Sequence, residues 1–295
     1  MRVVTLLPAA TEMVMALGGA DALVGVSHEC DYPPGVSHLP RLTTSPIDPS
    51  SPSGAIDAEV RRLREAGRPI ITVNAPAVAR LAPDLLITQG LCEVCAVADG
   101  EIHRLASVLH PAPAVLSLSA RTLSGIWDDI RAVAQALDLS SEGDELVAGL
   151  QSRLRRLQSR RPGVEPRVIC VEWLDPLYLA GHWVPELVEA AGGVDVGARA
   201  GSHSTTHGWS SAASLGPDII VVMLCGFGVS RARAELDALV SLEAERLFAG
   251  ATVWILDGNA FTSRPGPRVV DGAERLRAAI EGSEMPGLER WQPAE

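Results

Sequence analysis

Apolar positions along this chain fall into short runs that alternate with longer amphipathic stretches. Runs of four or five apolar residues are typical of strands buried on both faces, and their alternation with helical patterns predicts parallel α/β units. We expect strands in the first half at residues 3–7, 23–26, 70–73, 84–88 and 114–118. We expect strands in the second half at residues 167–172, 219–223 and 252–257.

Helices are predicted between these strands, where apolar residues recur at three- and four-residue spacing. Their predicted ranges are 11–17, 53–66 and 101–109 in the first half, and 184–191, 231–239 and 268–280 in the second. A further short helix is expected between residues 73 and 84. Gly18-Gly19, Gly67 and Gly192-Gly193 follow three of the helices, as glycine does at many helix ends. Segments 33–52 and 197–209 are rich in Pro, Ser, Thr and Gly and are predicted to be loops.

The middle of the chain follows a different pattern, because segments 122–137 and 142–161 are both helical with no strand between them. Leucines at 146, 150, 154 and 157 form one apolar stripe on the second helix, which would extend about 30 Å. We therefore predict an α/β fold of two parallel-sheet, Rossmann-like lobes joined by a long rigid helix. The predicted divisions are an N-terminal lobe at 1–120, a helical linker at 121–163 and a C-terminal lobe at 164–295.

Length and charge limit the possible functions. The chain has 295 residues, 47% of them hydrophobic, which is enough for two domains with real cores. Its net charge is −11, and all 25 of its basic residues are Arg because it contains no Lys. An acidic surface argues against nucleic-acid partners and against anionic membranes. No apolar run is long enough for membrane insertion as a span.

The N-terminus bears on localisation. Met1-Arg2 leads directly into a strand-like run, with none of the three regions of a signal peptide. If Met1 is the natural start, we expect a cytoplasmic protein; with an upstream start and leader it would be periplasmic or otherwise extracytoplasmic.

Candidate ligand-binding residues follow the predicted strands, because ligands of parallel sheets bind beyond the carboxyl ends of the strands. Six of the eleven aromatic residues lie at such ends or in adjacent loops. A cleft lined by aromatic rings with a few polar groups suits a large, flat, partly apolar ligand. The candidates are Glu29, Tyr32, Gln89, Trp173, Asp175, Trp183, Trp209, Phe227, Asn259 and Phe261. No nucleophile elbow, P-loop or zinc-protease motif is present, so we assign no catalytic residue.

Four of the five cysteines, Cys30, Cys92, Cys95 and Cys225, also follow predicted strands. Three interpretations stay open for them: structural thiols, ligands of a metal ion or iron–sulfur cluster, and a redox pair at Cys92 and Cys95. Cys170 lies inside a predicted strand, where we expect a small buried hydrophobe.

Several motifs carry a family resemblance. They are Val4-Thr5-Leu6-Leu7-Pro8-Ala9-Ala10-Thr11-Glu12, Ala16-Leu17-Gly18, Leu23-Val24-Gly25-Val26, Cys30-Asp31-Tyr32-Pro33, Leu39-Pro40-Arg41, residues 81–87 and residues 183–193. The sequence resembles the helical-backbone (class III) periplasmic substrate-binding proteins of ABC importers, which serve cobalamin, haem and iron–siderophore uptake. The cobalamin-binding branch is the most similar.

This resemblance implies a binding protein without enzymatic activity. It implies that two lobes hold cobalamin, or a related corrinoid or small-molecule metal chelate, in an aromatic cleft between them. Tyr32 and Trp183 are the positions that best match the family's motifs. An exported protein of this kind has an ABC permease as its partner. The alternative hypothesis is a cytoplasmic enzyme or redox protein that uses the four cysteines to hold a metal ion or iron–sulfur cluster.

Overall fold

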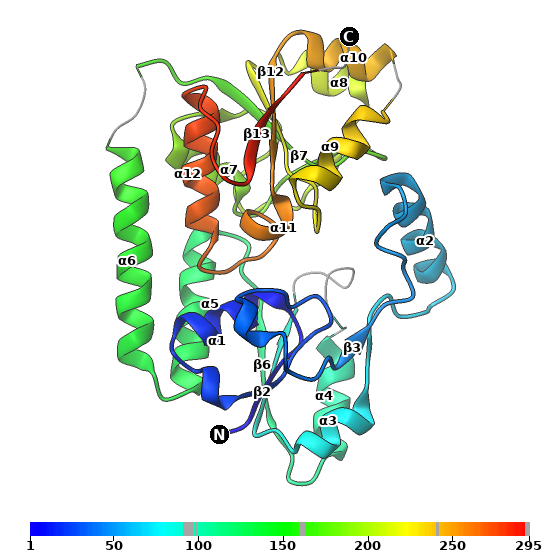
Figure 1. Cartoon of the computed structure of the whole chain (residues 1–295), viewed down its shortest axis with the longest axis vertical. Helices are drawn as coiled ribbons and strands as arrows, with labels where there is room; N and C mark the ends of the chain where they lie inside the picture. The colour runs from blue at the N-terminus through cyan, green and yellow to red at the C-terminus, as the bar shows by residue number, and fades with distance from the viewer. Residues whose placement is uncertain (91–96, 98, 160–162, 240–241, 293–295) are drawn as a thin grey trace. The chain divides into compact units, whose positions relative to one another are not determined.

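The computed structural model describes residues 1–90, 97, 99–159, 163–239 and 242–292 (Figure 1). Its contacts divide the chain into two compact units. Unit 1 comprises Met1–Ser51, Ala55–Ala120 and Ser124–Ala148, and unit 2 comprises Pro52–Gly54, Arg121–Leu123 and Gly149–Glu295. Each unit contains its own β-sheet.

A parallel sheet forms the centre of unit 1, as the apolar runs predict. Its strands, in spatial order, are β2 (Leu23–Gly25), β1 (Val3–Thr5), β5 (Leu85–Gln89) and β6 (Ala114–Leu118). Every residue of β1 and β5 is buried, which explains why these strands are continuous rather than alternating apolar runs. Because all neighbours are parallel, the loops that follow β2, β1, β5 and β6 leave from the same edge of the sheet.

Unit 1 also contains helices and short helical segments. They are α1 (Pro8–Ala16), η1 (Ala20–Ala22), η2 (Pro34–Val36), α2 (Ser53–Glu65), α3 (Ala75–Leu81), α4 (Asp99–Val108) and α5 (Leu123–Ala136). Of these, α1, α3 and α4 contact the strands of this sheet. Leu42, Leu63, Leu86 and Ile102 are fully buried in one core cluster of this unit.

Two sequence predictions for unit 1 are wrong in detail. The expected parallel strand at 70–73 is only β4 (Thr72–Val73), and it pairs antiparallel with β3 (Thr43–Thr44) in a separate two-stranded sheet. Ile70 and Ile71 are buried in the core without joining a strand, so this short apolar run reflects burial rather than strand pairing. The predicted loop at 33–52 contains both η2 and β3.

The helical middle of the chain is confirmed as α5 followed by α6 (Ser140–Gln158). The boundary between the units falls inside α6, after Ala148. The later half of α6 is bound to α12 (Val269–Ile280) through Arg153, whose guanidinium pairs with Asp271 and lies 2.7 Å from Glu274. A separate linker domain at 121–163 stays a prediction.

The sheet of unit 2 has a parallel centre with antiparallel edges. Its spatial order is β10 (Thr205–Thr206), β8 (Tyr178–Leu179), β7 (Arg167–Trp173), β11 (Ile219–Val222), β12 (Thr252–Leu256) and β13 (Leu288–Trp291), and β9 (Val194–Asp195) pairs with β7. The parallel centre confirms the three predicted strands. The antiparallel partners β8, β10 and β13 are not predicted, because they are too short or too polar to show an apolar run.

The helices of unit 2 are α7 (Val184–Ala191), α8 (Trp209–Ser214), α9 (Val229–Asp237), α10 (Leu242–Ala249), α11 (Gly258–Phe261) and α12. Helices α7 and α12 lie side by side, and the buried Arg277 of α12 donates to the carbonyl of Ala191 at the end of α7 (Figure 1). The predicted loop at 197–209 is wrong at its end, because Trp209 begins α8.

Among the described residues, no helix is long and apolar enough to cross a membrane.

Gly258 allows α11 to lie directly against the loop that follows β11. A β-carbon at this position would be 2.3 Å from the carbonyl oxygen of Leu224 and 2.6 Å from that of Met223, both backbone atoms. We predict that Gly258→Ala lowers the free energy of unfolding by about 1–3 kcal/mol, since the backbone must move to accept the methyl group. Gly250→Ala is the control, because nothing lies within 4 Å of its β-carbon position. Urea unfolding of both variants measures the difference, and equal stabilities would contradict the prediction.

Candidate functional site

The loop that follows β2 in unit 1 carries Glu29 and Tyr32 at its surface. Glu29 is exposed, and 43% of the Tyr32 side chain is accessible. The loop leaves the sheet beside the segment Pro40–Thr43, to which it is joined by backbone bonds between Val26 and Pro40 (3.0 Å) and between Leu42 and Val26 (2.8 Å). We call residues 27–32 the β2 loop.

The interior of the β2 loop is held by polar side chains. Thr43 Oγ1 lies 3.0 Å from Ser27 Oγ, 2.9 Å from the backbone nitrogen of His28 and 2.7 Å from His28 Nδ1. The guanidinium of Arg41 donates to the carbonyl oxygens of Ser27 and Cys30. Partial burial, with Arg41 nearby, lowers the pKa of His28 and favours its neutral form.

Cys30 occupies a structural position in this loop. Its side chain is only 1% exposed, and its Sγ lies 3.0 Å from Thr11 Oγ1, which in turn is 2.6 Å from Thr5 Oγ1. This buried chain of polar atoms connects the β2 loop to α1 and to the end of β1. The thiol of Cys30 is thereby placed inside unit 1 rather than at its surface.

Gln89 ends β5 at the same edge of the sheet as the β2 loop, but only 8% of the residue is exposed. The structure therefore brings Glu29, Tyr32 and Gln89 to one edge of unit 1, and only the first two have exposed side chains.

Unit 2 presents a pair of aromatic rings at the ends of neighbouring strands. Trp173 is the last residue of β7, and its ring centroid lies 5.3 Å from that of Phe227, which follows β11. The guanidinium carbon of Arg231 lies 4.5 Å from the centre of the Phe227 ring, a cation–π geometry. Asp175 is exposed, and its carbonyl oxygen accepts a hydrogen bond from Trp173 Nε1 at 3.1 Å. We call this group the Trp173 face.

Helix α11 adds Asn259 and Phe261 to the same edge of unit 2. The side chain of Asp257 caps the helix by accepting from the backbone nitrogen of Ala260 at 2.8 Å, a typical N-cap bond. The backbone nitrogen of Asn259 donates to the carbonyl of Phe227 at 3.2 Å, which joins α11 to the Trp173 face. Arg275 stacks on the Phe261 ring with its guanidinium carbon 3.6 Å from the ring centre.

Trp183 has a supporting position. It is 5% exposed, and its Nε1 donates to the carbonyl oxygen of Thr262 at 3.0 Å, directly after α11. The indole therefore fixes the end of α11 from inside unit 2. Contact of the Trp183 ring with a ligand stays a prediction from the family resemblance.

Trp209 does not join the other aromatic candidates. Its ring lies 5.9 Å from Phe248, whose ring is 5.6 Å from Trp291. Trp291 pairs with Val253 near the start of β12, whereas the Trp173 face follows the ends of strands. The helix α8, which the sequence pattern did not reveal, directs Trp209 into this separate aromatic cluster.

The structure describes only two of the four candidate metal-binding cysteines, and these two belong to different units. Cys30 is buried in unit 1, Cys225 is half-buried in unit 2, and Cys92 and Cys95 lie outside the described residues. Among described residues, no group of three or more His, Cys, Asp or Glu side chains could hold a metal ion. Metal binding by these cysteines stays an untested prediction.

Cys170 is fully buried in β7, and burial raises the pKa of its thiol, as expected of a small hydrophobe.

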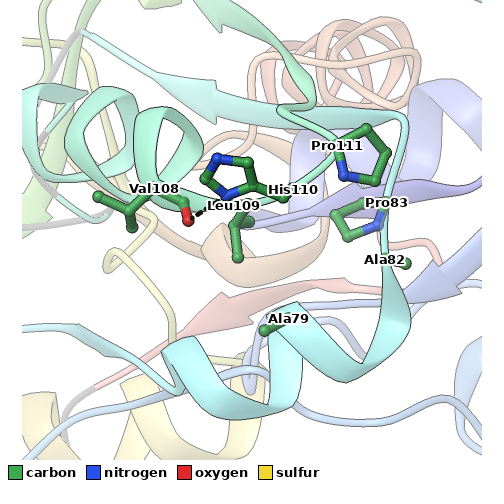
Figure 2. Close-up of a pocket in the computed structure, with 7 residues that line it drawn as sticks. All are labelled: Ala79, Ala82, Pro83, Val108, Leu109, His110 and Pro111. Carbon is green, nitrogen blue, oxygen red and sulfur yellow. Dashed lines mark hydrogen bonds between the residues drawn. The ribbon is translucent and has the colours of Figure 1, made fainter.

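One pocket of about 210 Å³ lies elsewhere on unit 1 (Figure 2). Its lining comes from the end of α3 and from the turn between α4 and β6, and comprises Ala79, Ala82, Pro83, Val108, Leu109, His110 and Pro111. Pro83 and Pro111 precede β5 and β6, so this pocket is at the start of the strands and is separate from the candidate residues. Its mostly apolar lining contains no candidate site residue.

Sequence reasoning missed Thr43, His28, Arg41, Arg231 and Arg275. Three of them carry a local signal: His28 follows a predicted strand, Arg41 lies in the Leu39-Pro40-Arg41 motif, and Arg231 follows Phe227 by four residues, close to one helical turn. Thr43 and Arg275 reach the site through contacts between distant segments.

The sequence pattern of the family described as "Periplasmic binding protein" matches residues 3–242. This chain belongs to the periplasmic binding protein family.

Proteins that are similar to this chain are named for different ligands. The vitamin B12-binding protein of Vibrio cholerae is 23% identical over 282 residues, which cover 93% of this chain and 87% of that protein. A periplasmic haem-binding protein from Pseudomonas aeruginosa has a similar fold, with a TM-score of 0.72, 21% identity and coverage of 100% of this chain and 99% of that one. The solved vitamin B12-binding protein of Vibrio cholerae gives a TM-score of 0.64 at 22% identity, over 95% and 96% of the two chains.

These comparisons confirm the expected fold and a substrate-binding protein of the ABC-importer type. The family consists of solute-binding proteins rather than enzymes.

Proposed function

We propose that this periplasmic binding protein binds cobalamin or a related corrinoid. The observation that carries the proposal is the Trp173 face at the ends of parallel strands, where the half-buried Trp173 ring lies tilted against the buried Phe227 ring and Arg231 lies over Phe227. Phe261 and its stacked Arg275 extend the aromatic surface on unit 2, and Tyr32 provides an exposed ring on unit 1. Ring faces bind the flat edge or face of a large macrocycle without needing a charged partner. Where the protein is exported, its partner is the permease of an ABC importer.

The choice of a corrinoid over haem rests on the sequence relative and on the chemistry of the metal. The relative found by sequence along nearly the whole chain is a vitamin B12-binding protein, and the similar solved structures include both haem and vitamin B12 binders. Haem iron commonly takes an axial ligand from a protein side chain such as His, Cys, Met or Tyr. Cobalamin carries an axial base of its own. Ring contact is therefore sufficient for a corrinoid.

Titration of the purified chain with cyanocobalamin, cobinamide and haemin tests the proposal directly. We expect saturable binding of cyanocobalamin with one ligand per chain, detected by calorimetry and by a change in the corrin absorption spectrum. Tighter binding of haemin than of both corrinoids would overturn the corrinoid assignment. Absence of binding by all three compounds would overturn the proposed function itself.

Two tryptophans offer a matched comparison of position. Trp173→Leu removes a ring from the Trp173 face and should weaken cyanocobalamin binding about 10- to 100-fold, the range expected when an aromatic contact residue is truncated. Trp209→Leu removes a ring from the Phe248 cluster and should change the affinity less than about twofold, because that cluster is elsewhere in unit 2. Calorimetry measures both dissociation constants. Equal losses in the two variants would show that the Trp173 face has no special part in binding.

Tyr32 distinguishes the two kinds of ligand. If the ring of Tyr32 packs on a corrinoid, Tyr32→Phe should keep the affinity within about threefold, while Tyr32→Leu should weaken it about tenfold or more. If the phenol oxygen is an axial ligand of haem iron, Tyr32→Phe should lose haemin affinity and change the haem spectrum. Titration of both variants with both ligands separates these results, and loss of cyanocobalamin binding in Tyr32→Phe would contradict stacking.

A further inference from the structure

The β2 loop is held on two sides before it reaches Tyr32. On one side, Thr43 and Arg41 contact its residues 27, 28 and 30. On the other side, Cys30 Sγ lies 3.0 Å from Thr11 Oγ1 of α1. All these contacts lie within unit 1. Tyr32 follows the last of these held positions by two residues and is the exposed ring of the loop.

Thr43 is the centre of this arrangement. Thr43 and Ser27 are each only 1% exposed, so water cannot take the place of the hydrogen bonds that Thr43 makes. A hydroxyl donates one hydrogen bond and accepts two. The backbone N–H of His28 donates to the Thr43 hydroxyl and uses one of its two acceptor positions. The hydroxyl can then donate one hydrogen bond and accept one more, in its contacts with Ser27 Oγ and His28 Nδ1. In either neutral tautomer of His28, all three contacts are satisfied at once, and the hydroxyl of Thr43 is fully used.

We propose that Thr43 is a positioning residue for ligand binding: its hydroxyl fixes the β2 loop so that Tyr32 is already in its binding orientation when the ligand arrives. This inference rests on the proposed function, in which Tyr32 contacts the ligand. A loop that is ordered in advance loses less conformational entropy on binding, so the affinity is higher. Without the hydroxyl the loop samples other conformations, and the apparent affinity falls by the fraction of molecules that remain competent to bind.

The chain provides a conservative variant and a matched control for this test. Thr43→Val keeps the shape of the side chain and removes the hydroxyl, whereas Thr43→Ser keeps the hydroxyl. Thr44→Val makes the same change one residue along β3, where the hydroxyl faces Thr72 Oγ1 at 3.0 Å and the residue is exposed. Arg41→Met loosens the same loop in a second way, because it removes the guanidinium that donates to the carbonyls of Ser27 and Cys30. Arg41 is exposed, so the change leaves the core intact.

Cyanocobalamin affinity measured by calorimetry gives the result. We expect Thr43→Val to bind about tenfold more weakly than the unmodified chain, and Arg41→Met to lose affinity in the same direction. Thr43→Ser and Thr44→Val should bind within about twofold of the unmodified chain. If Thr43→Val folds poorly, as judged by thermal unfolding, the Arg41→Met variant carries the test.

A double-mutant cycle separates positioning from a general structural effect. In a Tyr32→Leu background, the loss caused by Thr43→Val should shrink to less than about twofold, because the side chain that Thr43 positions is absent. An undiminished tenfold loss in that background would overturn the inference, and so would unchanged affinity of Thr43→Val and Arg41→Met. In both cases the unmodified chain still binds cyanocobalamin, so the proposed function stands. If the unmodified chain binds no ligand, the proposed function fails and the inference fails with it.

Discussion

Parallel alignment of buried strands is the constraint on which the candidate site depends. In unit 1, Val3, Val4 and Thr5 pair in register with Leu85, Leu86 and Ile87, and in unit 2 the strands β7, β11 and β12 are aligned in the same way. A parallel sheet covered on both faces has almost no polar surface along its strands, and polar or aromatic groups that must reach a ligand emerge where strands end. The β2 loop, the Trp173 face and α11 all begin at such ends. Backbone pairing between parallel strands places these groups at one edge of each sheet, and side-chain contacts then fix their orientations.

Arginine side chains make several of these side-chain contacts. Arg231 and Arg275 both lie over phenylalanine rings, and Arg41 donates to two carbonyl oxygens of one loop. The planar guanidinium can stack and donate at the same time, which a lysine ammonium cannot do as well. In a chain without Lys, these arginines serve to hold aromatic rings and loops in place as well as to carry charge.

The fold is largely predictable from the sequence, because its signals are local. The range of α7 is predicted to the residue from its apolar spacing and the Gly192-Gly193 stop, and the central strands of both sheets follow from short apolar runs. The candidate site is predictable only in outline. Strand ends identify Trp173, Phe227 and Phe261. The buried contacts of Cys30 with Thr11 and of Trp183 with Thr262 join residues that are distant in sequence, so no local pattern reveals them. Trp209 illustrates the same limit, since its neighbour Phe248 comes from another helix.

The accessibility of the cysteines has a practical consequence. Among the described cysteines, Cys30 and Cys170 are enclosed in their units, whereas Cys225 is half-buried and lies two residues before Phe227. Under native conditions, alkylation of the described thiols should therefore favour Cys225. A fluorophore attached there would report on the surroundings of the aromatic surface of unit 2, and a chain with Ser in place of its other cysteines would carry that single reporter.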